Sequence, residues 1–188
     1  MDVVDLLQRG AGRHYDGVSQ LDHALQCALL ARRDRADDEV VLAALLHDVG
    51  HLAGPDAGPV SSDAEEDPAH HHGQRGAQLV RPFVPPRVAW LIANHVVAKR
   101  YLCSVDARYE LRLSPVSRRS FAAQGGVLGV EERLGLEVQP WFADAVRIRR
   151  GDDVAKAAGM TVPGLADYVP LLERFFGVQS VPAPSERR

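Results

Sequence analysis

An apolar run, VVLAALL, separates the acidic residues Asp38 and Glu39 from the pair His47-Asp48. The run predicts a helix from roughly Asp38 to Asp48 that is apolar on nearly every side. Such a helix has to be covered on all its faces, so we expect it at the centre of a packed core. The sequence therefore predicts that an imidazole and a carboxylate, those of His47 and Asp48, lie together at the end of a buried helix.

Helical periodicity dominates the rest of the chain, and no alternating strand pattern of useful length occurs. Ser19 and Asp22 predict a capping box for a helix that continues to about Arg33 and carries His23 on its apolar face. Further helices, several announced by proline near the first turn, are expected at residues 69–80, 86–98, 116–134, 140–157 and 164–176. We therefore expect an all-α bundle of about seven helices.

The size of the chain sets its domain organisation. With 188 residues, 46% of them hydrophobic, it has apolar material for one core and little more. We expect one domain over residues 1–178, followed by a disordered tail over residues 179–188, where the sequence is polar and rich in proline. The stretch from Leu52 to Pro68 has no periodicity and is expected to be a surface loop.

Charge and cysteine content exclude several classes of partner. The formal net charge of -3 gives no support to nucleic-acid binding. Cys27 and Cys103 do not form a CxxC pair, so we expect neither a disulfide framework nor a thiolate zinc site, and both thiols to pack as small hydrophobic groups. No apolar run approaches the ~20 residues that cross a bilayer, and the N-terminus lacks the positive charge of a signal peptide. We expect a cytoplasmic protein; the oligomeric state stays open.

Four of the eight histidines stand in apolar helical sequence: His23, His47, one of His70–His72, and His95. An isolated histidine in a helix is usually a core residue with a hydrogen-bond partner. Burying an imidazole without any partner costs about 1–3 kcal/mol, however, so four such sites favour ligation. The carboxylate of Asp48 can bridge two cations, and carboxylate with imidazole, without thiolate, suits iron, manganese or other divalent metals better than structural zinc.

These residues carry a resemblance to a known superfamily. His23, the pair His47-Asp48 in HDVGH, and an aspartate in RRGDDVAK resemble the H…HD…D signature of HD-domain proteins. More narrowly, VSQLDHALQCA, HHHGQRGAQLV, NHVVAKRYL, LSPVSRRSFAAQGG and RIRRGDDVAK together resemble the phosphonate-degrading HD oxygenases, typified by 2-amino-1-hydroxyethylphosphonate dioxygenase. The similarity extends from about Val18 to Lys156, which is most of the chain.

The resemblance implies a set of ligands for two metal ions. The first ion would be held by His23, His47, Asp48 and Asp152, with Asp48 bridging to a second ion held by His72 and His95. His72 is preferred because the family reads His-x-x-x-Gly-Ala at this place, although His70 and His71 remain alternatives. Asp152 is preferred over Asp153 because related inositol oxygenases have a lysine four residues after the ligand, where Lys156 stands.

The resemblance also implies residues that bind the substrate. Lys99 follows His95 by one helical turn and can reach an anion at the metal centre, with a solvated surface lysine as the alternative. Arg149, His51 and Ser117 match family residues that bind the phosphonate, and a guanidinium fork suits phosphonate oxygens.

The chain departs from the family at the gate of the metal site. Where the family has a tyrosine and a glutamate that form a latch over one iron, this chain has Arg13 and Asp16. The neighbouring Tyr15 is expected to replace the latch tyrosine, with Asp16 in place of the glutamate. If Tyr15 does not, gating and substrate would both differ.

The implied function is cleavage of the carbon–phosphorus bond of a 1-hydroxyalkylphosphonate. The cofactors would be two iron ions, Fe(II) and Fe(III), with O2 as co-substrate and with phosphate and a carboxylate as products. The alternative is a metal-dependent HD phosphohydrolase acting on a nucleotide or phosphomonoester; a non-catalytic metal-binding domain is a third possibility. The phosphonate stays open, since an ammonium group needs an acidic or amide partner and a trimethylammonium group an aromatic cage.

Overall fold

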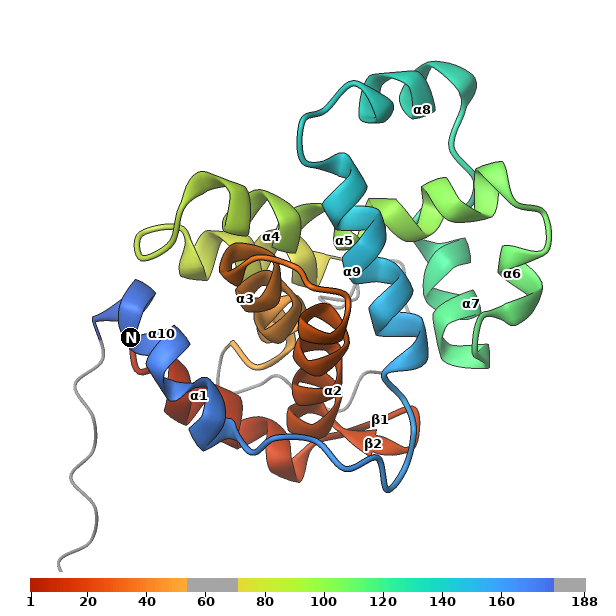
Figure 1. Cartoon of the computed structure of the whole chain (residues 1–188). Coiled ribbons are helices and arrows are strands. Elements are labelled where there is room, and N and C mark those ends of the chain that lie inside the picture. The colour runs from red at the N-terminus through yellow and green to blue at the C-terminus, as the bar shows by residue number, and fades with distance from the viewer. Residues whose placement is uncertain (54–70, 178–188) are drawn as a thin grey trace, which may run out of the picture.

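The computed structural model describes residues 1–53 and 71–177, and the described chain is almost entirely helical (Figure 1). Its α-helices are α1 (Val3–Arg9), α2 (Gln20–Arg33), α3 (Asp38–Leu46), α4 (His72–Val80), α5 (Pro86–Val105), α6 (Tyr109–Arg112), α7 (Pro115–Ala123), α8 (Val130–Glu137), α9 (Phe142–Val154) and α10 (Val169–Phe176). Short 3-10 turns are η1 (Gly10–Gly12), η2 (Val49–His51) and η4 (Leu165–Tyr168), and β1 (His14–Tyr15) pairs with β2 (Val18–Ser19). The predicted all-α class is confirmed, with ten α-helices in these ranges rather than about seven.

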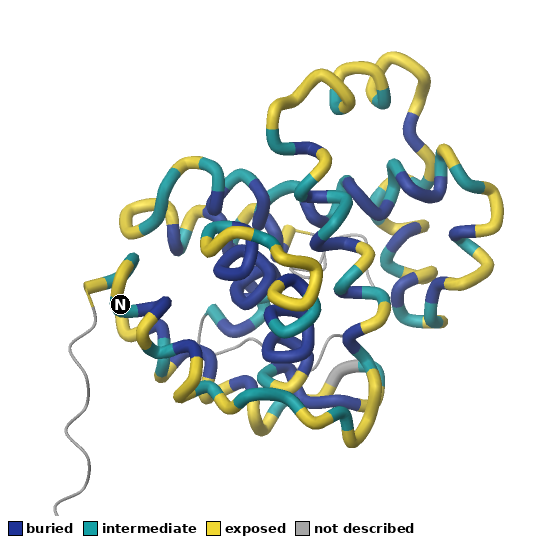
Figure 2. The backbone as a smooth tube through the Cα atoms, in the orientation of Figure 1, coloured by how far each residue is buried: buried dark blue, intermediate teal, exposed yellow. Residues whose placement is uncertain are grey.

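The predicted central helix is α3, and all its residues from Val40 to Leu46 are buried. It packs against α2, α5 and α9, and α9 packs in turn against both α2 and α5. Figure 2 shows α2 and α3 buried in the middle of the molecule, whereas α8 is largely exposed at the periphery. The packing around α3 therefore fixes the position of the residues that follow it in the chain.

Local capping explains where α2 and α3 begin. The Ser19 side chain accepts a hydrogen bond from the backbone N–H of Asp22 at 3.0 Å, as the predicted capping box requires. Asp37 does the same for the N–H of Val40 at 3.1 Å. The first cap fixes the start of the helix that carries His23, and the second fixes the start of the helix that leads into His47 and Asp48.

Two predicted helices differ from the structure. The expected helix over residues 116–134 is wrong as one element, because the chain turns between α7 and α8 at Gly125 and Gly126, whose φ angles of +96° and +64° favour glycine. The expected helix over residues 164–176 begins as the 3-10 turn η4 and becomes α-helical at Val169. The helices α1 and α6 were not predicted.

A hairpin precedes α2. Tyr15 pairs with Val18 and His14 with Ser19, and the two-residue turn between the strands has positive φ at Asp16 (+53°) and Gly17 (+92°). Asp-Gly is a typical sequence for such a turn and was the signal that could have predicted it. The side chain of Tyr15, most of the predicted loop from Leu52 to Pro68 and the predicted tail lie outside what the structure describes.

Candidate metal centre

Six side chains from five parts of the chain converge at the end of α3. His23 comes from α2, His47 and Asp48 follow α3, His72 begins α4, His95 lies within α5 and Asp152 lies in α9. The four imidazoles and the Asp152 carboxylate are buried, and the Asp48 side chain is only 14% exposed. These are the six residues for which the sequence predicted metal ligation, and the structure brings all of them together.

The carboxylate of Asp48 divides these histidines into two pairs. Its Oδ2 lies 3.6 Å from Nε2 of His23 and 3.5 Å from Nε2 of His47. Its Oδ1 lies 3.3 Å from Nε2 of His72 and 3.6 Å from Nε2 of His95. One oxygen therefore faces each pair of imidazoles, as a carboxylate that bridges two cations has to.

The ring nitrogens on the outer side of the cluster are held by backbone carbonyls. The Nδ1 atoms of His23, His47 and His95 lie 2.6, 2.8 and 2.7 Å from the carbonyl oxygens of Ala155, Ala44 and Ile92. Such contacts leave Nε2 unprotonated and directed inward, as a metal requires. Nε2 of His47 is buried without any hydrogen-bond partner in the described structure. A cation at this position would satisfy it, so the residues present fit a metal ion.

The protonation states also suit ligation. Burial lowers the pKa of His95 to about 4, and burial together with the charge of His72 lowers the pKa of His51 to about 3. Burial of Asp48 opposes its ionisation, but His47 and the contacts that His72 and His95 make with its carboxylate hold the pKa of this carboxyl well below the usual range. Neutral imidazoles around an ionised carboxylate are the forms that bind divalent metals. His23 differs from His47 and His95, because burial opposes its protonation but Cys27 and Asp152 nevertheless raise its pKa, so a metal ion would have to displace its proton.

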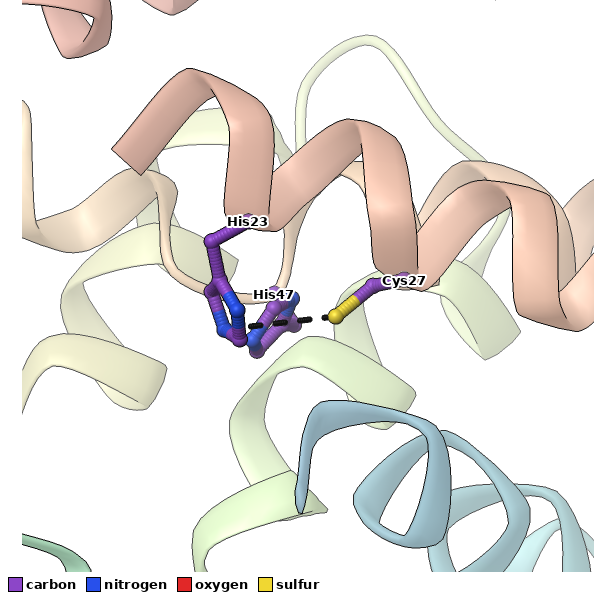
Figure 3. Close-up of side chains that lie close together, drawn as sticks. All are labelled: His23, Cys27 and His47. Carbon is purple, nitrogen blue, oxygen red and sulfur yellow. Dashed lines mark hydrogen bonds between the residues drawn. The ribbon is translucent and has the colours of Figure 1, made fainter. Parts of the chain in front are cut away.

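Cys27 is a neighbour of the cluster that the sequence analysis missed. It lies one helical turn after His23 on α2, and Figure 3 shows its thiol directed toward that imidazole, with Sγ 3.9 Å from Nε2 of His23. His23, Cys27 and His47 offer three possible ligand atoms within 4.8 Å of one another. Burial raises the pKa of the Cys27 thiol, which favours the protonated form and leaves nitrogen and oxygen as the preferred donors. The i, i+4 spacing from His23 was the available signal.

The structure separates the candidates that the sequence left open. Oδ1 of Asp152 lies 3.2 Å from Nε2 of His23. Asp153 instead accepts hydrogen bonds from the Tyr109 hydroxyl and from Arg149, which also binds Asp152. Tyr109 comes from the unpredicted α6; the sequence offered it, with Trp90, Tyr101 and Trp141, as a ring that could contact a substrate cation, but not as a partner of Asp153.

The three neighbouring histidines also differ in their positions. His72 is buried with Nε2 3.0 Å from Nε2 of His95, whereas His71 is exposed and outside the cluster. His70 lies outside the described residues.

A basic cluster adjoins the metal centre; it consists of Lys99, Arg149, Lys156 and the hydroxyl of Ser117. Lys99 is 3% exposed and donates a hydrogen bond to Oγ of Ser120 at 2.7 Å, so it is not the solvated lysine of the alternative. Burial, with the charge of Arg149, lowers the pKa of Lys99 to about 7. Lys156 donates to Oγ of Ser117 at 3.0 Å. Buried cations beside a metal centre suit an anionic ligand.

The remaining predicted residues lie at the edge of this arrangement. The ring of His51 stacks on His72 with ring centres 4.1 Å apart, and its Nε2 is 4.0 Å from Oδ1 of Asp48. From the hairpin, Asp16 forms an ion pair with Lys156, and Arg13 donates a hydrogen bond to the carbonyl of His51 at 2.9 Å. The two residues at the family's latch positions thus both contact residues of the site.

Known proteins match this chain over most of its length. A model of the HD domain matches residues 21–121, and the chain belongs to the HD-domain family. It is 42% identical to the hydroxymethylphosphonate dioxygenase of Gimesia maris, over 88% of this chain and 82% of that protein. It is 34% identical to the [1-hydroxy-2-(trimethylamino)ethyl]phosphonate dioxygenase (glycine-betaine-forming) of Leisingera caerulea, over 84% of this chain and 79% of that protein. Within the described part of the chain, no helix is long and apolar enough to span a membrane.

Proposed function

We propose that this protein is a diiron dioxygenase that cleaves the carbon–phosphorus bond of a 1-hydroxyalkylphosphonate, with hydroxymethylphosphonate as the favoured substrate. The observation that carries the proposal is the Asp48 carboxylate, which faces one pair of imidazoles with each oxygen and stands beside buried cations. The names of two relatives, both phosphonate dioxygenases, support the same chemistry.

Each residue of the centre has a part in this proposal. His23, His47, Asp48 and Asp152 would hold one iron, and Asp48, His72 and His95 would hold the other. A bound Fe(II)/Fe(III) pair supplies the activation of O2 and the oxidation of carbon 1. The protein fixes the ligands through the carbonyls behind the histidines and keeps the centre largely out of water.

The phosphonate would be bound by residues around the basic cluster. Lys99, Arg149 and Ser117 are buried there, and His51 lies at the second pair of imidazoles, stacked on His72. The guanidinium fork of Arg149 is already oriented by Asp152 and Asp153, so little side-chain freedom is lost when an anion binds. These residues would neutralise the dianion while carbon 1 stays at the metals.

The overall reaction balances with O2 as the sole oxidant. Hydroxymethylphosphonate and O2 give formate, phosphate and a proton; the O–O, C–P and one C–H bond break, and carbon 1 is oxidised while O2 is reduced. The chain's residues need supply only binding, orientation and a site for the released proton. His51, beside Asp48 and with its pKa lowered to about 3, is neutral at pH 7 and would contact the phosphonate as an uncharged imidazole, so the released proton would pass to solvent.

The aromatic residues argue against a trimethylammonium substrate. Trp90 and Trp141 pack against each other with ring centres 5.9 Å apart, and Tyr101 donates a hydrogen bond to the exposed Glu137. Tyr109, by contrast, lies at the site through its hydrogen bond to Asp153, so within residues 1–53 and 71–177 these four rings do not form a cage around one cation. A substrate without a cationic group fits the arrangement better.

The test is turnover by iron-loaded, partly oxidised protein. Mixed with hydroxymethylphosphonate, it should consume O2 and release phosphate and formate in equal amounts, and the Asp48→Asn variant should do neither. Phosphate release from nucleotides or phosphomonoesters without O2 uptake would instead show a phosphohydrolase. Bound metal with no turnover of either class would show a metal-binding domain.

A further inference from the structure

The turn of the β1–β2 hairpin holds a carboxylate against the basic cluster. Oδ2 of Asp16 is buried and lies 3.3 Å from Nζ of Lys156, and the side chain of Asp16 is 19% exposed. The positive φ angles of Asp16 and Gly17 place this carboxylate through the geometry of the turn itself. Its position is therefore set by the hairpin rather than by a flexible loop.

Lys156 joins this carboxylate to the rest of the site. While it pairs with Asp16, the same ammonium donates to Oγ of Ser117, and the charge of Lys156 acts on Lys99. The connection therefore runs from the hairpin to the residues proposed to bind the phosphonate.

The other carboxylates beside these cations also have cationic or imidazole partners. Asp152 and Asp153 both accept hydrogen bonds from Arg149, and Asp48 faces imidazoles. An ammonium group on the carbon next to carbon 1 would thus lie near the cations Lys99, Arg149 and Lys156, and each neighbouring carboxylate would already be paired with another group. Placing a charge in such a site without a partner is strongly unfavourable.

We infer that the ion pair between Asp16 and Lys156 determines substrate specificity by excluding 1-hydroxyalkylphosphonates that carry an ammonium group. This inference rests on the proposed function and deepens it. Asp16 is the acidic residue that the hairpin contributes. Because its charge is neutralised by the ion pair with Lys156, it does not serve as a counter-ion for the substrate. Hydroxymethylphosphonate has no cation to place and is not affected by this exclusion.

The decisive variant is Lys156→Met, which keeps much of the side-chain volume and leaves Asp16 without its cation. Its kcat/KM is compared with that of the wild type for hydroxymethylphosphonate and for 2-amino-1-hydroxyethylphosphonate. The preference should shift toward the amino compound by about tenfold, which corresponds to about 1.4 kcal/mol. The double variant Lys156→Met, Asp16→Asn should lose this gain, and Arg150→Met, which removes an exposed cation of α9, should leave the preference unchanged.

Equilibrium binding of the same two compounds to the metal-loaded protein under anaerobic conditions provides a readout without turnover. Suppose that the wild type consumes O2 with hydroxymethylphosphonate and that Lys156→Met keeps the wild-type preference in both kinetics and binding. That result would overturn the inference and leave the proposed function intact. If wild-type protein consumes no O2, the proposed function fails, and the ratio of the two dissociation constants still decides whether the ion pair discriminates.

A second variant guards against misfolding of the first. Asp16→Asn keeps Lys156 and releases its ammonium from the carboxylate. It should bind hydroxymethylphosphonate more tightly and the amino compound more weakly than the wild type. Tighter binding of the amino compound by Asp16→Asn would contradict the inference.

Discussion

Asp48 is the residue on which both halves of the candidate metal centre depend, since each of its oxygens faces a different pair of histidines. We predict that Asp48→Asn loses both metal ions, whereas His72→Ala loses one and keeps the ion held by His23 and His47. Metal content per chain after dialysis, measured by inductively coupled plasma mass spectrometry, tests this. His71→Ala is the matched control, because its imidazole is adjacent in sequence but exposed, and it should keep the full content. Equal losses from His71→Ala and His72→Ala would refute the assignment.

Lys99 gives a prediction on the pH dependence of stability. Its pKa falls from 10.5 in a solvated lysine to about 7 in the fold, so the unfolded chain binds more protons between these values and folding becomes more favourable as pH rises. A difference of one in pKa corresponds to about 1.4 kcal/mol. Lys99→Met should therefore stabilise the metal-free protein most below pH 7, with a gain that shrinks toward pH 10.

Urea unfolding at a series of pH values measures this difference. Arg150→Met, which removes an exposed cation, should follow the wild-type curve at every pH. A Lys99→Met curve that runs parallel to the wild type would mean that the ammonium is not buried in solution.

Among single residues, the sequence predicted those whose position in an apolar helical pattern shows that they are buried. His23, His47, Asp48 and His95 stand in apolar helical sequence, and burial followed from that pattern. Tyr109 could not be predicted in the same way, because it approaches Asp153 from a segment 44 residues away and nothing in its local sequence distinguishes it. The choice between Asp152 and Asp153 likewise needed the rotation of α9 about its axis, which adjacent residues do not reveal.

The contact between η2 and α4 leaves no space for a side chain at Gly50. A Cβ on Gly50 would clash with the backbone carbonyl of His72 and lie 2.8 Å from the backbone nitrogen of Gly76, and neither backbone atom can move alone. We predict that Gly50→Ala destabilises the fold by about 3 kcal/mol and weakens metal binding, because the shift would displace His72 from His95.

Gly135→Ala is the control for this prediction. Gly135 lies in the exposed α8, and a Cβ added there would have no atom within 4 Å, so alanine should stabilise the helix by about 0.5–1 kcal/mol. Denaturant unfolding and the metal content of both variants test the predicted loss of stability and of metal binding in Gly50→Ala. Gly50→Ala with wild-type stability would show that the backbone of α4 can withdraw.

Element boundaries were predictable where a local signal fixes them. The capping box at Ser19 gave the start of α2 correctly. The adjacent glycines Gly125 and Gly126 were compatible with a helix break, but the periodicity on either side favoured one element; the positive φ angles of both residues show the turn. The hairpin was missed because two residues in each strand are too few for an alternating pattern, although Asp16-Gly17 was a usable signal.

For the molecule as a whole, bound metal should act as a cross-link between its helices. The proposed ligands come from α2, the end of α3, α4, α5 and α9, so unfolding of any of these exposes the ions. Chelation should lower the unfolding temperature, and ferrous iron should restore it; a ligand at a hundredfold excess over its dissociation constant adds about 2.7 kcal/mol. Scanning calorimetry with and without chelator tests this, and in Asp48→Asn the chelator should have no effect. An unchanged transition in the wild type would argue against a metal that spans these helices.

The distance along the chain between His23 and its contacts in α9 has a consequence for biosynthesis. The segment matched by the HD-domain model ends at residue 121, before Asp152 and before Ala155, whose carbonyl holds the His23 ring. A nascent polypeptide therefore presents its histidines to the cellular metal pool while the last carboxylate is still inside the ribosome. An ion bound before Asp152 emerges would meet a site that is open on the side of α9, so we expect metal exchange to slow only after α9 has packed against α2.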